Sequence, residues 1–384
     1  MYRFFFILFL IYSCNNSISI NKDGWIKSSN LKTINNISYL EKSKKKYIIK
    51  KDLIIPKNKT LVLKNGVELF LKNSAQIINN GTLIIGESNI DSLFFFNVSE
   101  LKNYEKYYNV FIYSKKESVF YLKNNSSFFL NNCFIKNVDF NIEKSDFKIN
   151  NSIINNSVLE LNNSSLIFNN SYFYNTLISI NNSTLNLNGC VFNNSKNLKF
   201  NSLKNLNLNN NLIFNNSGLL INNCNNTNII NNVFFNNNNS LTINNKTGFN
   251  KIYNNLFIKN NTALEINNNS IFYIVNNNFD INNIAIKTNN SLKTNNNIIS
   301  KNNIYSYNNE DFDINNYNII NSYCLSNNNI LKGYYNILGN PEYINSINFN
   351  YNLNNNSPAL RSGNNNTNLG VNINTIYNIK YLKY

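Results

Sequence analysis

Apolar and polar residues follow one another in the same order through the middle of the chain, and this order returns every 19 to 23 residues. Each repeat opens at a lead position, which is apolar with a single exception and is followed by asparagine. A second apolar position lies four residues after the lead. The lead residues are Leu130, Ile149, Phe168, Leu187, Leu208, Ile230, Tyr253, Val275 and Thr294. A period of this length predicts a solenoid in which neighbouring coils bury one continuous core.

The position two residues after the lead is the most restricted of the repeat. It is asparagine in every repeat except at Gly189. Asparagine and glycine share a tolerance for a left-handed backbone, so we expect a tight corner with positive φ here in each coil. The predicted corner residues, whose side chains would hydrogen-bond along the stack as a ladder, are Asn132, Asn151, Asn170, Gly189, Asn210, Asn232, Asn255, Asn277 and Asn296.

Each repeat contains a further short run of β-forming residues, such as Leu177–Ile180 and Leu241–Ile243, bounded by Asn-Asn or Asn-Ser pairs. Such pairs are typical of turns. The pattern therefore predicts about three short strands per coil, with no stretch long enough for a helix. Coils of this kind stack about 4.8 Å apart through parallel backbone hydrogen bonds.

The cysteines obey the same register. Cys133 and Cys190 each lie three residues after a lead residue, and their leads are three repeats apart. Stacking would separate them by about 14 Å, whereas a disulfide needs Cα atoms within about 7 Å. We expect both to be small apolar members of one side-chain column.

The spacing and the asparagine corners resemble the right-handed parallel β-helix, the pectin-lyase-like fold. The runs at Tyr47–Pro56, Leu61–Leu69 and Gly81–Gly86 look like the opening coils of extracellular β-helix proteins. The runs at Asn340–Tyr343 and Asn356–Leu360, with two glycines after them, are similar to the closing segment of bacterial right-handed β-helix repeat proteins. The resemblance extends from about residue 46 to about residue 370 and predicts an all-β fold.

A leucine-rich-repeat-like solenoid is the alternative fold. Leu203, Leu206, Leu208, Asn211 and Ile213 fit the consensus of that repeat. Most other repeats lack its asparagine, and the rest of each repeat is β-like rather than helical. We therefore place this fold second.

The N-terminus has the form of an export signal. A positive charge at Arg3 precedes the apolar run Phe4–Tyr12, which is too short to span a bilayer. The run ends at Ser13 and Cys14, and this junction resembles the lipobox of bacterial lipoproteins, in which the cysteine thiol takes a diacylglyceryl group. The alternative is an ordinary signal peptide that ends near a cysteine.

These features divide the chain into four parts and give it a location. Residues 1–13 are expected to be a lipoprotein signal peptide, 14–45 a tether and cap, 46–338 the β-helix coils and 339–384 the closing segment. The expected location is the cell envelope, at the outer membrane or cell surface, with the N-terminal lipid holding the chain to the membrane.

The charge of the chain favours anionic partners. The net charge is +16, it comes almost entirely from lysine, and there is no histidine. For an exported chain, a basic surface favours anionic polysaccharide or lipid headgroups, and no nucleic acid partner is expected.

The resemblance implies two possible reactions, cleavage of uronate polymers and glycoside hydrolysis, and the residues of this sequence favour neither. The uronate-cleaving enzymes of the resembled family use a Ca²⁺ site of clustered carboxylates and a basic residue, usually arginine; the hydrolases use grouped aspartates, commonly with a histidine. Arg361 is the only arginine in the body of this chain, and the carboxylates of the coils are scattered. We therefore lean towards a module without catalysis.

Two groups of charged residues are candidate sites. Asp280 is the only charged residue in its column, and with Lys259 one coil earlier it predicts a substrate or cation contact in a surface groove; the alternative is a solvated ion pair. Glu310, Asp311 and Asp313 have a spacing that would suit Ca²⁺. The alternative there is an acidic loop without a metal, and no other cofactor is expected.

The expected function is that of a membrane-anchored exported lipoprotein whose β-helix acts as a non-catalytic binding or structural, adhesive module, with polysaccharide as the candidate partner. The alternative is a carbohydrate-active enzyme, either a polysaccharide lyase or a glycoside hydrolase, with an atypical site. A glycosylated secreted protein is a third hypothesis, since sequons such as the one at Asn36 are plentiful, but an asparagine-rich chain produces many of these.

Overall fold

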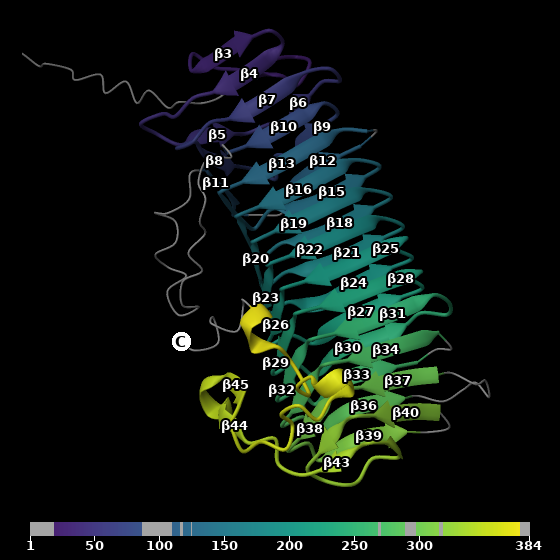
Figure 1. Ribbon diagram of the computed structural model, residues 1–384. Helices are drawn as coiled ribbons and strands as arrows, with labels where there is room; N and C mark the ends of the chain where they lie inside the picture. Colours follow the sequence, from purple (N-terminus) through teal and green to yellow (C-terminus); the bar gives the residue numbers. More distant parts are fainter. Residues whose placement is uncertain are drawn as a thin grey trace, which may run out of the picture.

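The computed structural model describes residues 19–86, 110–115, 118–123, 125–267, 270–288, 297–314 and 318–376. In this part of the chain, three long sheets run side by side along one axis, and each coil contributes one strand to each sheet (Figure 1). The first coils lie at one end of the rod and the last coils at the other. Apart from the antiparallel pair β3–β4, the strands within these sheets pair in parallel.

Sheet 1 has 15 strands and follows the lead positions of the repeat. Its strands are β3 Leu31–Ile34, β4 Ile37–Leu40, β7 Thr60–Leu63, β10 Thr82–Ile85, β13 Ser127–Asn131, β16 Asp146–Asn150, β19 Ser165–Asn169, β22 Thr184–Asn188, β25 Asn205–Asn209, β28 Asn226–Ile230, β31 Phe249–Tyr253, β34 Ile271–Val275, β37 Asn297–Lys301, β40 Asn318–Ser322 and β42 Gly333–Tyr334.

Sheet 2 has 14 strands and begins just after the asparagine corner. Its strands are β5 Tyr47–Ile49, β8 Glu68–Leu71, β11 Val110–Ser114, β14 Cys133–Lys136, β17 Ile153–Asn155, β20 Tyr172–Tyr174, β23 Val191–Asn193, β26 Leu212–Phe214, β29 Val233–Phe235, β32 Leu256–Ile258, β35 Asn278–Asp280, β38 Ile304–Ser306, β41 Leu325–Ser326 and β43 Ile337–Leu338.

Sheet 3 has 12 strands. They are β6 Leu53–Ile55, β9 Ile77–Asn79, β12 Val119–Leu122, β15 Asp139–Glu143, β18 Val158–Asn162, β21 Leu177–Asn181, β24 Lys196–Asn201, β27 Gly218–Asn222, β30 Asn239–Asn244, β33 Thr262–Ile266, β36 Ile284–Thr288 and β39 Glu310–Ile314. The remaining elements are β1 Ser19–Ile20, β2 Ile26–Lys27, β44 Tyr343–Asn345, β45 Asn350–Leu353 and the single 3₁₀ turns η2 Ser346–Asn348, η3 Asn364–Asn366 and η4 Ile373–Thr375.

The predicted fold class, an all-β right-handed parallel β-helix, is confirmed. The leucine-rich-repeat alternative is wrong, because each described coil turns from strand to strand with no helix between them. In the described part of the chain, no helix combines the length and the hydropathy needed to cross a bilayer.

The core forms because equivalent residues of successive coils lie directly above one another. Leu130 pairs with Ile149, which pairs in turn with Phe168, and all are buried. In the last coils, aromatic rings of sheet 2 form an interior stack: the centroids of Phe234 and Phe257 are 4.7 Å apart, and their planes differ by 3°. Phe279 and Tyr305 continue this stack.

The predicted corner needs a correction in its second half. Positive φ occurs at the five predicted positions from Asn132 to Asn210. At the same corner of the next three coils, the left-handed residues are Asn231, Asn254 and Asn276, each one position earlier than predicted. Asn296 lies outside the described residues.

The error arose because these coils carry two adjacent apolar residues at the lead. Neighbouring residues of a strand point to opposite faces, so only one of the two can enter the core. Ile229, which pairs with Leu208, is the buried one, and Ile230 faces outward. Tyr253 and Val275, also taken as leads, face outward in the same way.

Asn232, Asn255 and Asn277 belong instead to a fully buried column just after the corner. We call this column the inner amide ladder, and its members are Asn211, Asn232, Asn255, Asn277 and Asn303. From the second member onward, Oδ1 of each asparagine accepts hydrogen bonds from the backbone N–H and the side-chain amide of the asparagine before it. A matching ladder follows sheet 2 at Asn216, Asn237, Asn260, Asn282 and Asn308.

The same column is occupied by smaller residues in the earlier coils. Cys133, Ser152 and Cys190 are three of them, and the backbone N–H of Cys133 donates to Ser152 Oγ at 3.1 Å. Cys133 lies in β14 and Cys190 directly precedes β23, three coils on. Both are free and buried, as predicted.

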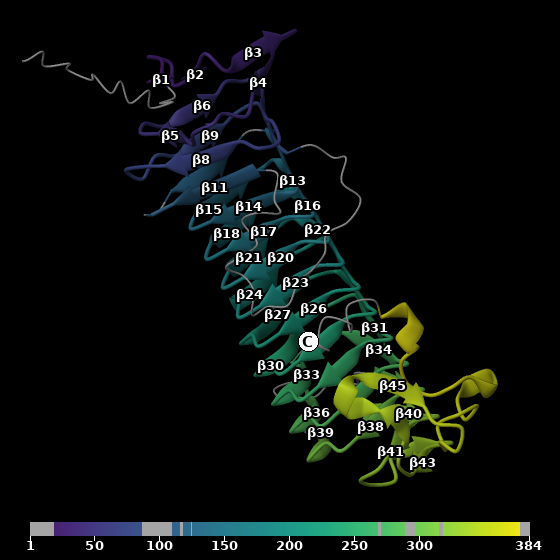
Figure 2. The same cartoon turned by 90° about the vertical axis from the view of Figure 1, so that its left-hand side faces the viewer.

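The outer face of sheet 2 is also apolar, and the end of the described chain packs on it. Residues Tyr343–Ile376, here the C-terminal segment, pack against outward side chains of β26, β29, β32 and β35. Figure 2 shows this segment, in yellow, beside the last coils of the rod. Tyr351 and Ile376 join Leu256 and Ile258 in one buried cluster. Both faces of sheet 2 are therefore buried in this region. The outer face of sheet 1 has a groove, described below, that the C-terminal segment does not cover.

Candidate ligand-binding surface

A groove of about 660 Å³ crosses the outer face of sheet 1, and we call it the sheet 1 groove. It is lined by Asn205, Asn226, Asn228, Phe249, Lys251, Tyr253, Tyr273 and Val275. These residues come from four consecutive strands, β25, β28, β31 and β34. At the spacing of parallel strands the groove spans about 14 Å along the rod, and pockets of its volume are typical of ligand sites.

The strand register brings the groove residues together. On β31, Phe249, Lys251 and Tyr253 all face outward because they are alternate residues of one strand. Tyr273 pairs with Lys251 on the next strand, and Asn228 pairs with Lys251 on the strand before. Sequences separated by more than 20 residues thus meet on one face.

Two aromatic rings of the groove are open to solvent: 58% of Phe249 and 39% of Tyr273 are exposed. Beside them, the amides form a short outward row in which Asn228 Nδ2 donates to Asn207 Oδ1 at 3.0 Å. Each amide in such a row keeps free donor or acceptor capacity for a bound molecule. The surface therefore offers flat apolar rings next to hydrogen-bonding groups.

Of the described residues that line the groove, Lys251 alone is charged. Its Nζ lies 5.2 Å from the centroid of the Tyr253 ring. A cation over an aromatic face is held in place by the ring quadrupole, which positions the ammonium group above the sheet. The groove can therefore contact sugar rings, hydroxyl groups and an acidic substituent at once.

Asp280 does not contact a surface groove, so that prediction is wrong. It faces outward from sheet 2 but is buried beneath the C-terminal segment, where its carboxylate accepts hydrogen bonds from Ser306 Oγ at 2.6 Å and Tyr351 OH at 2.9 Å. Burial raises the pKa of Asp280, and the two hydrogen bonds and the charge of Lys259 act in the opposite direction.

Lys259 occupies the corner after β32, with φ of 53° and an exposed side chain. Its backbone N–H donates to Asp280 O at 3.1 Å. No ion pair joins the two side chains among the described residues. The solvated ion pair considered as the alternative is therefore not formed either.

The predicted Ca²⁺ ligands are not gathered into a site. Asp311 points inward and is buried, with Asn308 Nδ2 at 3.1 Å and Ser326 Oγ as donors, whereas Glu310 is exposed. Asp313 faces outward on sheet 3. No group of three potential metal ligands occurs among the described residues.

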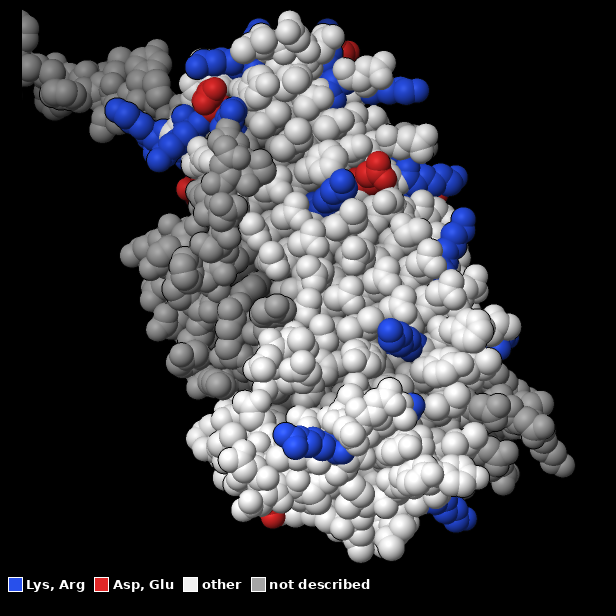
Figure 3. Space-filling model, viewed as in Figure 1, with Lys and Arg blue, Asp and Glu red and all other residues white. Residues whose placement is uncertain are grey.

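Other carboxylates lie away from the cavities. On the outer face of sheet 3, Lys287 lies between the carboxylates of Glu265 and Asp313 on neighbouring strands. None of the three residues lines a described cavity. Cys14, the predicted lipidation site, lies outside the described residues. Lysines are scattered singly over the visible face and are densest around the first coils, with few acidic side chains between them (Figure 3).

The sequence signals the groove through two adjacent apolar pairs, Ile252-Tyr253 and Ile274-Val275. Tyr253 and Val275 were assigned to the core because each directly precedes an Asn-Asn pair. Two adjacent apolar residues in a strand of a half-buried sheet mean that one of them is exposed. Such pairs therefore mark where the outer face becomes apolar.

Comparison with known proteins identifies no relative by sequence: no family model and no curated protein matches. Two solved structures share the architecture. Tailspike protein 3 of bacteriophage CBA120 aligns with a TM-score of 0.32 and 12% identity, over 73% of this chain and 54% of the tailspike, so the chain spans about half its length. The periplasmic alginate epimerase AlgG aligns with a TM-score of 0.29 and 9% identity, over 76% of this chain and 80% of the epimerase. Similarity at this level reflects coil architecture alone.

Proposed function

We propose that the protein is an exported, non-catalytic module that binds polysaccharide in the sheet 1 groove. The observation that carries this proposal is the combination of exposed rings at Phe249 and Tyr273 with an amide row and one lysine on a single face. Sugar rings present apolar C–H faces that pack on aromatic rings, and their hydroxyl groups pair with amides. Lys251 favours a polymer with acidic units.

Binding is favoured over catalysis because the described cavities lack the groups that catalysis needs. None of the three is lined by aspartate or glutamate. Hydrolysis of a glycosidic bond generally requires two carboxyl groups flanking that bond. The buried carboxylates Asp280 and Asp311 are enclosed by hydrogen bonds from the protein itself.

The membrane anchor is the second part of the proposal. It rests on the junction of Ser13 and Cys14 after a short apolar run. Acyl chains contribute about 0.8 kcal/mol per buried CH₂, so more than one chain on Cys14 would hold the protein at a membrane. Metabolic labelling with a fatty acid tests this: we expect label in the wild type and none in Cys14→Ala, and equal labelling of both would refute the anchor.

Polymer binding tests the groove. We expect the protein to be retarded in affinity electrophoresis by an acidic polymer, alginate or polygalacturonate, more than by neutral galactomannan. Tyr273→Ala should weaken binding about tenfold, the equivalent of roughly 1.4 kcal/mol. Tyr334→Ala is the matched control, because Tyr334 is an exposed tyrosine on sheet 1 outside the groove.

Two outcomes would contradict the proposal: the absence of retardation by all three polymers, or an equal effect of the two substitutions. Cleavage of a polymer during the experiment, seen as a falling chain length, would favour the enzyme alternative instead.

A further inference from the structure

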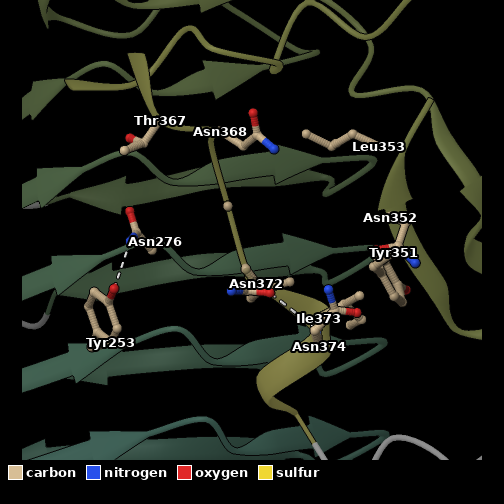
Figure 4. A pocket seen from close by; sticks show the side chains of 12 residues that line it. Tyr253, Asn276, Tyr351, Asn352, Leu353, Thr367, Asn368, Asn372, Ile373 and Asn374 are labelled. Carbon is tan, nitrogen blue, oxygen red and sulfur yellow. Dashed lines mark hydrogen bonds between the residues drawn. The ribbon is translucent and has the colours of Figure 1, made fainter. Parts of the chain in front are cut away.

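A second cavity lies where the C-terminal segment passes over the corner between sheets 1 and 2. Its volume is about 470 Å³. One wall is formed by Tyr253 and Asn276 of the coils, and the other by residues of the C-terminal segment (Figure 4). The segment's contribution includes Tyr351, Thr367, Asn368 and Asn372.

The corner asparagines hold the C-terminal segment at three of four consecutive coils. Asn302 Oδ1 accepts a hydrogen bond from the backbone N–H of Asn364, and Asn254 Oδ1 accepts one from that of Asn372. Asn231 Oδ1 accepts a weaker bond from Thr375 Oγ1 at 3.4 Å. These contacts fix the path of the segment along the coils.

Asn276, the remaining corner asparagine, does not bond to the segment. Its Nδ2 donates to Tyr253 OH at 3.1 Å, and its Oδ1 is buried without a hydrogen-bond partner among the described residues. In Figure 4 this oxygen lies on the side of the residue that faces Thr367, across the cavity. Asn276 therefore lines the cavity without being tied to the C-terminal segment.

The lining indicates the class of ligand. The described lining contains amides, a hydroxyl, backbone groups and two tyrosines, and none of its side chains is charged. A carboxylate placed here would lose its hydration without meeting a cation. An uncharged molecule with several hydroxyl groups would match both the amides and the tyrosine rings.

We infer that this cavity is a binding site for an uncharged sugar unit, whose hydroxyl groups pair with the side-chain amides of the lining. The site is separate from the sheet 1 groove and does not depend on polymer binding there, although Tyr253 lines both. A volume of about 470 Å³ lies within the range of small-molecule sites and accommodates a mono- or disaccharide.

Titration of the full chain with cellobiose, lactose or chitobiose, followed by saturation-transfer NMR, tests this inference. At least one of these disaccharides should bind, and digalacturonate should bind at least tenfold more weakly. Asn276→Gly should reduce the affinity for the bound disaccharide about tenfold. Glycine tolerates the φ of 57° at this position, so the substitution removes the side chain without straining the corner.

Asn151→Gly is the matched control, because Asn151 occupies a left-handed corner in a distant coil. It should leave disaccharide binding unchanged. Thr367→Val, which replaces a hydroxyl with a methyl group on the opposite wall, supplies a second variant should Asn276→Gly unfold the corner.

Several outcomes would overturn the inference. The first is the absence of binding by all three neutral disaccharides, and the second is equal affinity in the wild type and both cavity variants. The third is loss of disaccharide binding in Tyr273→Ala alone, because this result would place the sugar in the sheet 1 groove. Disaccharide binding without polymer binding would instead uphold the cavity and refute the proposed function.

Discussion

Asp280 links the last coils to the C-terminal segment through a single buried carboxylate. Its donors are Ser306 on the next coil and Tyr351, which lies 71 residues further along the chain. Residues far apart in sequence thus converge on one group. The ionised form is held by two hydrogen bonds, but burial disfavours it and raises the pKa of Asp280.

This pKa shift sets the sign of a pH dependence. A carboxyl group whose pKa is higher in the folded state favours folding most when protonated, so its contribution is greatest below the usual pKa of aspartate and is lost as pH rises through the raised value. We expect the wild type to lose stability relative to Asp280→Asn over that interval. Melting temperatures of both proteins between pH 3 and 7 measure the difference, and a difference that grows in the opposite direction would contradict this account.

The buried thiols allow a second residue-scale prediction. Burial raises the pKa of Cys133 and Cys190 to about 12 and that of Cys224 to about 11. Since the thiolate is the reactive form, we expect these cysteines to resist iodoacetamide at neutral pH in the native protein and to react in guanidinium. Peptide mass spectrometry identifies the modified residues, and rapid labelling of native Cys133 or Cys190 would show that the column is open.

The inner amide ladder is the element that most restricts the sequence of the later coils. Asn255 accepts two hydrogen bonds from Asn232 and donates to Ile229 O, Tyr253 O and Asn277 Oδ1. All of these hydrogen bonds are made by the fully buried side-chain amide of Asn255. Its removal leaves several polar groups without a partner in the core.

We therefore expect Asn255→Ala to lower the free energy of unfolding by about 3 kcal/mol or more, since each unsatisfied buried group costs about 1–3 kcal/mol. Asn255→Ser should cost less, because serine fills this column in earlier coils, where Ser171 Oγ accepts from the backbone N–H of Ser152. Chemical denaturation measures both.

Asn261→Ala is the control for this pair. Asn261 lies in the same coil in an exposed amide row, so its loss should change stability by no more than about 0.5 kcal/mol. Equal destabilisation by Asn255→Ala and Asn261→Ala would mean that the ladder contributes no more than a surface row.

At the scale of the whole molecule, the repeat determines the fold because every coil meets the same constraints. The period and the corners from Asn132 to Asn210, with their core columns, were predictable from the sequence, since each recurs with its neighbours in register. The burial of Asp280 was not, because the C-terminal segment that covers it lies outside the repeat. The groove was missed at Tyr253, where periodicity alone could not assign one of two adjacent apolar residues to the outer face.

The charge of the molecule predicts how binding responds to salt. With a net charge of +16 and Lys251 in the groove, binding of polygalacturonate should weaken as ionic strength rises, because salt screens exposed charges over about 10 Å at 0.1 M. Binding of an uncharged disaccharide in the second cavity should not change. Titrations at two salt concentrations check this, and a salt-independent affinity for polygalacturonate would argue against the role of Lys251.

The most direct test of polysaccharide binding in the sheet 1 groove is hydroxyl-radical footprinting of the full chain with and without polymer. Phe249 and Tyr273 are exposed in the free protein, and their oxidation should fall sharply when alginate or polygalacturonate is added. Tyr335, exposed outside the groove, should be oxidised equally in both states. Polymer binding that leaves Phe249 and Tyr273 as reactive as before would contradict the account.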